Sequence, residues 1–209
     1  MPAIRITIHP KNPEPRKIEE VAKAILAGQT IIYPTDTVYG IGCIITQARA
    51  VERIAAIRGI KPEKAQFSIM CADLSQLSHY AANIDHPTYR LLRRALPGAY
   101  TFILKASSLV PKILAQSKKT IGIRVAAHPV SHALLAAVGS PILTASLKND
   151  EDAYEYPTDP DEIYELFKHK VDVIVDGGAG NFNPSTIIDL TQSPPQILRA
   201  GAGPVDIID

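Results

Sequence analysis

The sequence has only two cysteines, Cys43 and Cys71, and no tryptophan. Two cysteines are too few for a disulfide framework or for a cysteine zinc site. No uninterrupted apolar run approaches the ~20 residues that a membrane-spanning helix needs. Residues 1–17 also lack the apolar segment of a secretory signal peptide. We therefore expect a cytoplasmic protein with reduced thiols and no membrane association.

The composition is that of an ordinary globular protein. The chain has 209 residues, of which 46% are hydrophobic and 21% are charged. These proportions allow a sizeable buried core, and the length suits one domain. We expect a single domain over residues 1–209, without internal repeats or low-complexity segments.

Charge is distributed unevenly although the net charge is only +1. Residues 49–124 contain 13 Lys and Arg but only 4 Asp and Glu. The remaining residues carry the opposite excess. A basic block of this kind can attract a polyanion, or it can consist of solvated helix faces that bind nothing.

Helical and strand-like periodicities alternate along the chain. A helix is predicted over 14–28, ending at Gly28, and a second over 46–59, with Thr46 as its cap and Gly59 at its end. Further helices are predicted over 74–82, 86–96, 128–139 and 159–170, and strands over 30–33, 65–71, 100–106, 120–127, 141–146, 171–178, 184–191 and 195–201. This alternation favours an α/β protein with a mixed parallel and antiparallel sheet, because strands 100–106 and 120–127 are too close for a long crossover.

The first candidate site is PTDTVYGIG, residues 34–42, which follows the strand at 30–33. Thr35 and Thr37 would share one side of an extended segment. Gly40 and Gly42 would let a ligand approach the backbone closely. The same residues could instead form a bulge or turn in which the threonines bind local backbone groups.

Basic residues provide the second and third candidates. Arg58, Lys61 and Lys64 follow the helix at 46–59. Arg58 would favour a helix end whatever the function, whereas the two lysines could reach a phosphate or carboxylate. Arg124 lies in an apolar strand, where its charge needs either a buried ion pair or a ligand oxyanion.

A metal site is not expected. His128 and His132 are four residues apart, but no Glu lies in the position that the metalloprotease motif requires.

The fourth candidate lies near the C-terminus, where Ser185, Thr186 and Arg199 occur at predicted strand ends and could bind a nucleotide phosphate. Turn formation would explain the neighbouring glycines equally well, and no Walker A motif is present.

Together these segments resemble the YrdC/YciO family, and most of all its YciO branch. The matching elements are YPTDTVYGIG, AVERIAAIRGIKPEK, LPGAYTFIL, TIGIRVAAHP, PILTAS, DGG, STIIDL and ILRAG, in family order over residues 29–201. The resemblance implies a YrdC-like (RibB-like) α/β fold, with a twisted mixed sheet flanked by helices and a deep concave site.

Members of this family include the threonylcarbamoyl-AMP synthases of tRNA modification. These enzymes join L-threonine, bicarbonate and ATP and release pyrophosphate. The resemblance therefore implies ATP as a cosubstrate, with any Mg²⁺ carried by the nucleotide. It also implies a basic concavity suited to double-stranded RNA, tRNA or rRNA.

The resemblance extends to individual positions. It implies substrate binding by Thr35, Thr37, Arg58, Lys64 and Ser146. It implies nucleotide binding by Arg124, Ser185, Thr186 and Arg199. The candidate RNA-binding patch consists of Lys61, Arg93, Arg94, Lys118 and Lys119.

Two positions depart from the synthase pattern. Ile60 replaces an arginine and Lys148 replaces an asparagine. Loss of one contact to developing charge typically costs roughly 10²–10³ in rate. The sequence thus leaves three hypotheses: a weak synthase, an enzyme that uses another carboxylate in place of threonine, and a non-catalytic RNA-binding protein.

Overall fold

The protein is built around one ten-stranded mixed sheet. The computed structural model describes residues 1–61, 65, 67–115, 119–147 and 156–208. Across the sheet the strand order is β1-β8-β2-β3-β7-β4-β6-β5-β9-β10. Four neighbouring pairs are parallel, namely β1 with β8, β8 with β2, β4 with β6 and β5 with β9, and the other pairs are antiparallel. This arrangement confirms the predicted mixed sheet.

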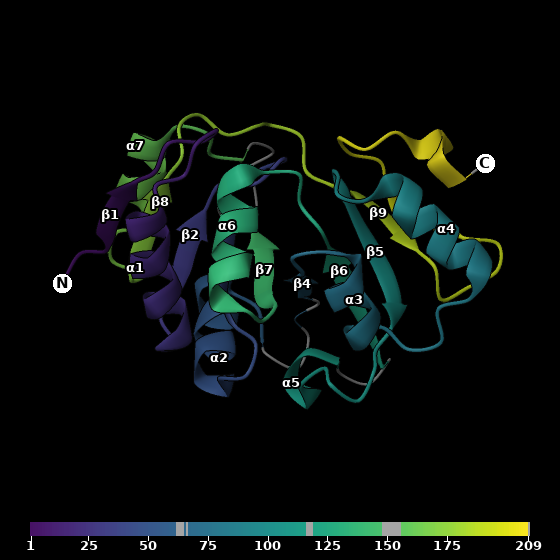
Figure 1. Ribbon diagram of the computed structural model, residues 1–209. Coiled ribbons are helices and arrows are strands. Elements are labelled where there is room, and N and C mark those ends of the chain that lie inside the picture. The colour runs from purple at the N-terminus through teal and green to yellow at the C-terminus, as the bar shows by residue number, and fades with distance from the viewer. Residues whose placement is uncertain (62–64, 66, 116–118, 148–155, 209) are drawn as a thin grey trace.

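The strands are short and lie across the whole width of the molecule (Figure 1). Their bounds are β1 Ile4–Thr7, β2 Ile31–Tyr33, β3 Gly40–Ile44, β4 Ser68–Met70, β5 Tyr100–Lys105, β6 Thr120–Arg124, β7 Ile142–Ser146, β8 Val173–Asp176, β9 Thr186–Asp189 and β10 Gln196–Arg199.

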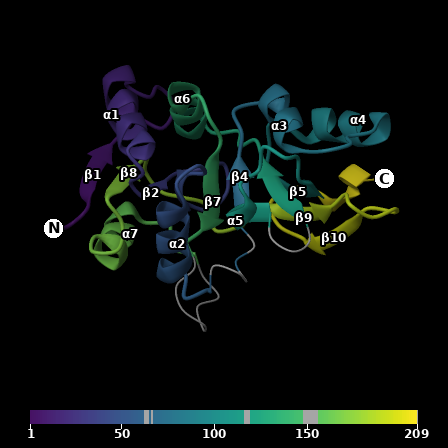
Figure 2. The same cartoon turned by 90° about the horizontal axis from the view of Figure 1, so that it is seen from below.

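Helices flank the sheet on both sides. Figure 2 shows α1, α6, α3 and α4 along one side and α2 and α7 on the other. Their bounds are α1 Pro15–Leu26, α2 Ala48–Ile57, α3 Leu74–Tyr80, α4 His86–Ala95, α5 Lys112–Ala115, α6 Pro129–Val138 and α7 Pro160–Phe167, and a 3-10 helix follows at Val205–Ile208. None of the helices in the described part of the chain is long and apolar enough to cross a membrane.

Alternate residues of the central strands enter two apolar cores. In β2, Ile31 and Tyr33 pack with α1 and α6, whereas Ile32 belongs to the core that contains the buried side chains of α2 and α7. Side chains alternate between the two faces of a strand, so a strand covered by helices on both faces must be apolar throughout. Such a sheet gives the residues at its strand ends rigid positions.

Most helix ends lie where the sequence predicts them. Asp73 caps α3 by accepting a hydrogen bond from the Gln76 amide. Gly28 and Gly139 follow α1 and α6 with φ of 83° and 68°, a conformation that favours glycine. The predicted cap of α2 is wrong, because Gln47 and not Thr46 occupies that position and makes no side-chain cap bond.

The strands β1 and β3 were not predicted. The β3 segment contains Gly40 and Gly42, and both contact neighbouring strands rather than open space. A Cβ atom on Gly42 would lie 2.4 Å from the Leu143 carbonyl oxygen and 3.0 Å from the Tyr33 ring. These glycines therefore serve strand packing, and the expectation that they open the backbone to a ligand is not supported.

Candidate functional site

A cavity of about 220 Å³ lies where several strand ends converge on the end of α2. Its polar lining consists of three arginines, Arg58, Arg124 and Arg199, and five hydroxyl residues, Ser68, Thr101, Thr144, Ser146 and Ser185. Its apolar lining consists of Val38, Ile60, Phe67, Ala145, Pro184 and Ile187. None of these fourteen side chains is acidic.

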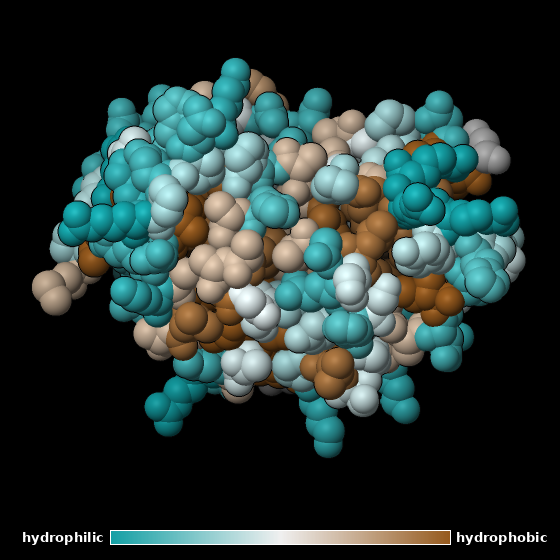
Figure 3. Space-filling view, viewed as in Figure 1, coloured by the Kyte–Doolittle hydropathy of each residue, from teal (hydrophilic) through white to brown (hydrophobic). Residues whose placement is uncertain are grey.

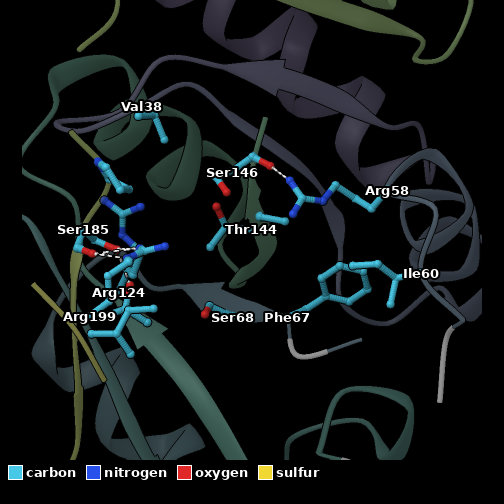
Figure 4. A pocket seen from close by; sticks show the side chains of 14 residues that line it. Val38, Arg58, Ile60, Phe67, Ser68, Arg124, Thr144, Ser146, Ser185 and Arg199 are labelled. Atoms are coloured by element: carbon cyan, nitrogen blue, oxygen red, sulfur yellow. Dashed lines mark hydrogen bonds between the residues drawn. The ribbon is translucent and has the colours of Figure 1, made fainter. Parts of the chain in front are cut away.

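The arginines lie on two sides of the cavity (Figure 4). Arg58 lies on one side, and Arg124 and Arg199 lie together on the other, with Thr144 and Ser68 between them. Gly122 of β6 lets the Ser68 and Thr101 side chains of the lining pack closely over it, since a Cβ atom there would lie 2.3 Å from the Ser68 Oγ and 3.2 Å from the Thr101 Cγ2. The cavity can thus accept two anionic groups, or one ligand with an anionic group at each end.

Arg124 ends β6 and is almost completely buried. Its Nη2 donates to the Asp36 carboxylate at 3.0 Å and to the Thr37 hydroxyl at 2.9 Å. Its Nε has no hydrogen-bond partner among the described residues. Burial lowers the pKa of Arg124, and the Asp36 carboxylate opposes that shift. The ion pair anticipated as one alternative is present, and the guanidinium still lines the cavity.

The polar corner at residues 34–39 holds Arg124 in place. Asp36 accepts a second hydrogen bond, from the Ala127 amide at 3.1 Å. The Thr35 hydroxyl donates to the Val38 carbonyl at 2.7 Å and lies 3.1 Å from the Thr37 hydroxyl. Thr35 and Thr37 are buried and do not line the cavity. The Thr37 hydroxyl therefore contacts Arg124 directly, and the Thr35 hydroxyl reaches it only through that of Thr37.

Arg199 is fixed by the strand beside it. Its Nε and Nη2 donate to the Ser185 carbonyl at 3.0 and 2.8 Å, and the Ser185 hydroxyl lies 2.8 Å from that of Thr101. Burial lowers the pKa of Arg199, and the nearby Arg124 lowers it further. Thr186 is fully buried and donates to the Gly203 carbonyl, so its hydroxyl supports the loop at residues 199–203 rather than the cavity.

Arg58 follows α2 and donates through Nη1 to the Ser146 carbonyl. Burial lowers the pKa of Arg58, and the Tyr156 phenol opposes this shift, as it also does at Arg199. The Tyr156 phenol is thus within electrostatic range of both Arg58 and Arg199. Nothing in the sequence singled out this tyrosine.

The charges around this cavity favour an anionic ligand. Three guanidinium groups surround it, and in the described part of the chain only Asp36 forms an ion pair with any of them. Buried charges of like sign destabilise one another unless a counter-ion is present. A ligand with phosphate or carboxylate oxygens would supply that counter-charge.

Five of the predicted site residues come together here: Arg58, Arg124, Ser146, Ser185 and Arg199. Lys64, Lys118 and Lys148 lie outside the described residues. Ser68, Thr101 and Thr144, which also line the cavity, were missed, because single hydroxyl residues in strands carry no local signal of function.

The predicted RNA-binding residues do not form one continuous surface in the described structure. Arg93 and Arg94 lie on α4, whereas Lys61 follows α2, and Figures 1 and 2 place these helices over different parts of the sheet. Lys119 precedes β6. RNA binding through this patch remains a prediction.

A second cavity, of about 750 Å³, differs in character. It is lined mainly by apolar residues from the start of α3, the segment before β5 and the segment leading into α6, including Leu74, Leu96, Pro97 and Val125. Figure 3 shows apolar surface in this area, between α6 and α4. The described residues that line it include no arginine or lysine, so its chemistry differs from that of the first cavity. Among the described residues, no group of three or more His, Cys, Asp or Glu could hold a metal ion.

A Thr37→Val variant tests how the polar corner acts. Valine matches the shape of threonine but cannot accept the hydrogen bond from Arg124. Hydrogen bonds to charged groups contribute about 1.5–3 kcal/mol, so we expect the free energy of unfolding in denaturant to fall by about 2 kcal/mol. Thr37→Ser keeps the acceptor and should lose much less. Equal losses in the two variants would show that the methyl group, rather than the hydroxyl, matters.

The fold and cavity define an α/β protein with an arginine-lined cavity at the convergence of its central strands. The chain belongs to the Sua5/YciO/YrdC family, whose model, described as "Telomere recombination", matches residues 23–201. It is 43% identical to the Escherichia coli K12 protein YciO over 199 residues, 95% of each chain. The crystal structure of E. coli YciO superimposes with a TM-score of 0.93 at 40% identity, covering 99% of both chains.

More distant relatives in the same family are enzymes by name. A threonylcarbamoyl-AMP synthase from Pyrococcus abyssi is 32% identical over 194 residues, which are 92% of this chain and 56% of the relative. The crystal structure of P. abyssi Sua5 complexed with L-threonine superimposes with a TM-score of 0.90 at 31% identity, covering 99% of this chain and 60% of that one. The present chain thus matches little more than half of the length of these relatives.

Proposed function

We propose that the protein binds ATP and a small carboxylate in the arginine-lined cavity and joins them by chemistry of the threonylcarbamoyl-AMP synthase type. The supporting observation is the placement of three arginines around a cavity that has no acidic residue among the described residues of its lining. Nucleotide phosphates would occupy the side of Arg124, Arg199 and Ser185. The carboxylate would lie at Arg58 and Ser146.

The reaction would rely on positioning and charge neutralisation. An oxygen of the carboxylate attacks the α-phosphorus of ATP, the bond to the β-phosphate oxygen breaks, and pyrophosphate leaves. With L-threonine and bicarbonate as substrates, the threonine amine first forms a C–N bond to the bicarbonate carbon and water leaves. The carboxylate of the resulting carbamate is then the attacking group, while the α-carboxylate of threonine stays at Arg58. Fixed guanidinium groups stabilise the charge that moves to the phosphate oxygens. A reaction that relies on positioning and charge neutralisation in this way requires no nucleophilic side chain.

The size of the cavity favours binding of the anionic groups of the ligand. Sites that enclose a whole ligand of drug size measure about 300–1,000 Å³. The present cavity, at about 220 Å³, suits the phosphates and a small carboxylate, with the nucleoside outside it. Ile60 contributes a hydrocarbon to this lining where the synthases carry an arginine, so we expect slow turnover of threonine.

Pyrophosphate release from ATP tests the proposal. We expect the purified protein to release pyrophosphate only when both L-threonine and bicarbonate are present, at a rate that the Ile60→Arg/Lys148→Asn double variant raises about 10-fold or more. Arg199→Ala is the matched loss-of-function control, because it removes one of the three cations. Absence of measurable ATP binding by the native protein at millimolar concentrations would refute the proposal.

A further inference from the structure

The side of the cavity that carries Arg58 is partly apolar. Ile60 and Phe67 lie next to each other there, below Arg58 in Figure 4. Phe67 is 7% exposed and belongs to the larger apolar core, and Ile60 is half-buried and packs against that core. Their positions are therefore set by packing and would change little when a ligand binds.

Arg58 retains hydrogen-bonding capacity toward the cavity. In the described structure only its Nη1 has a partner, the Ser146 carbonyl. A guanidinium presents five N–H donors, and two adjacent ones match the oxygens of a carboxylate. The Ser146 side chain lines the same part of the cavity and can donate a further hydrogen bond. The carboxylate of a ligand would thus lie between Arg58 and Ser146.

We propose that this side of the cavity selects a carboxylate whose side group is a branched hydrocarbon, with Ile60 and Phe67 as the residues that determine the preference. The inference rests on the proposed function, in which a carboxylate is the second substrate. A ligand held at Arg58 directs its side group toward these two apolar side chains. A hydroxyl there would lose its hydrogen bonds to water and gain no polar partner from Ile60 or Phe67, whereas a methyl group would be buried favourably.

The expected preference is moderate. Apolar pockets distinguish a methyl group from an isosteric hydroxyl by up to about 100-fold. Because Ile60 is only half-buried, we expect a factor of about 10 in dissociation constant. The preference should be the same for ligands with and without an α-amino group, since the discrimination occurs at the side group.

Calorimetric titration of the full chain with two matched ligand pairs tests this inference. L-valine and L-threonine differ only by a methyl group in place of a hydroxyl, and so do 3-methylbutanoate and 3-hydroxybutanoate. We expect the branched hydrocarbon to bind about 10-fold more tightly in each pair. Equal binding within the pairs, tighter binding of the hydroxyl ligands, or no binding of any of the four at 10 mM would overturn the inference.

Two variants test which residue determines the preference for a methyl group over a hydroxyl group. Ile60→Thr should reduce the preference within each pair to about twofold or less. The matched control is Ile187→Thr, which makes the same change in the lining contributed by β9. It should leave the preference unchanged. A preference that survives Ile60→Thr, or that falls equally in both variants, would show that Ile60 does not determine it.

Pyrophosphate serves as a separate probe of the proposed function. It should bind at Arg124 and Arg199 in the native protein and in Ile60→Thr with the same affinity. Pyrophosphate binding without any preference among the carboxylates would overturn the inference and leave the proposed function standing. Failure of both pyrophosphate and ATP to bind would remove the proposed function as well.

Discussion

Replacement of Arg124 by methionine should weaken pyrophosphate binding about 100-fold, since a charge-assisted hydrogen bond and a cation are lost together. The same change should lower the free energy of unfolding by about 3 kcal/mol, the lower part of the range for breaking a buried ion pair. Both side chains of the pair are about nine-tenths buried. The loss stays at the lower end because Asp36 retains its hydrogen bond from the Ala127 amide.

The partner substitution separates binding from stability. Asp36→Asn leaves Arg124 buried without its counter-charge, in a cavity that already contains Arg58 and Arg199. Stability should fall by a similar amount, about 3 kcal/mol. Pyrophosphate binding should nevertheless tighten about 10-fold, because the anion no longer competes with a fixed carboxylate for Arg124. A folding role alone would not produce opposite effects of the two substitutions on binding.

The double variant Asp36→Asn/Arg124→Met completes the cycle. Its loss of stability should be smaller than the sum of the two single losses, because neither partner is left as an uncompensated charge. Its pyrophosphate binding should stay as weak as that of Arg124→Met. Denaturant unfolding and calorimetric titration of the four proteins provide the measurements. Additive losses of stability would contradict the coupling between Asp36 and Arg124. Unchanged pyrophosphate binding in Asp36→Asn would contradict the assignment of Arg124 to the anion site.

This pair also illustrates how far the sequence alone could lead. The sequence made Arg124 a candidate site residue because a guanidinium in an apolar strand needs a partner. The sequence could not decide between an ion pair and a ligand, because the partner Asp36 lies 88 residues away and the two meet only through tertiary structure. The structure shows that the ion pair and the position beside the cavity coexist. The polar corner at residues 34–39 is buried because of how the strands are arranged in the sheet. No local sequence pattern describes that arrangement.

Local signals were reliable where the physical cause was local. The glycines after α1 and α2, Gly28 and Gly59, depend on a few neighbouring residues, and both were predicted. The strand β3 was missed because its glycines weaken any strand signal. The reason for those glycines is the Tyr33 ring on one neighbouring strand and the Leu143 carbonyl on another. β1 pairs only with β8, about 170 residues later, so nothing near it in sequence indicates its role.

The second large effect is expected at Ile54, which packs α2 against the sheet and has no exposed surface. Ile54→Ala removes three buried carbon atoms, and such substitutions cost about 2–5 kcal/mol in the free energy of unfolding. The Ile54 carbonyl also accepts a hydrogen bond from the Arg58 amide at 3.0 Å. A looser α2 should therefore disturb Arg58 as well as lower stability.

Because Arg58 is the one of the three cavity arginines that follows α2, the effect of Ile54→Ala on ligand binding should depend on which side of the cavity is probed. Binding of a carboxylate at Arg58 should weaken several-fold at a temperature where the variant is folded, while pyrophosphate binding at Arg124 and Arg199 should change little. Glu52→Ala is the matched control, since Glu52 is an exposed residue of the same helix, and its stability should change by about 0.5 kcal/mol or less. Equal weakening of both ligands in Ile54→Ala would mean that the two sides of the cavity are mechanically coupled. Unchanged carboxylate binding would show that Arg58 is positioned by its bond to the Ser146 carbonyl rather than by the packing of α2.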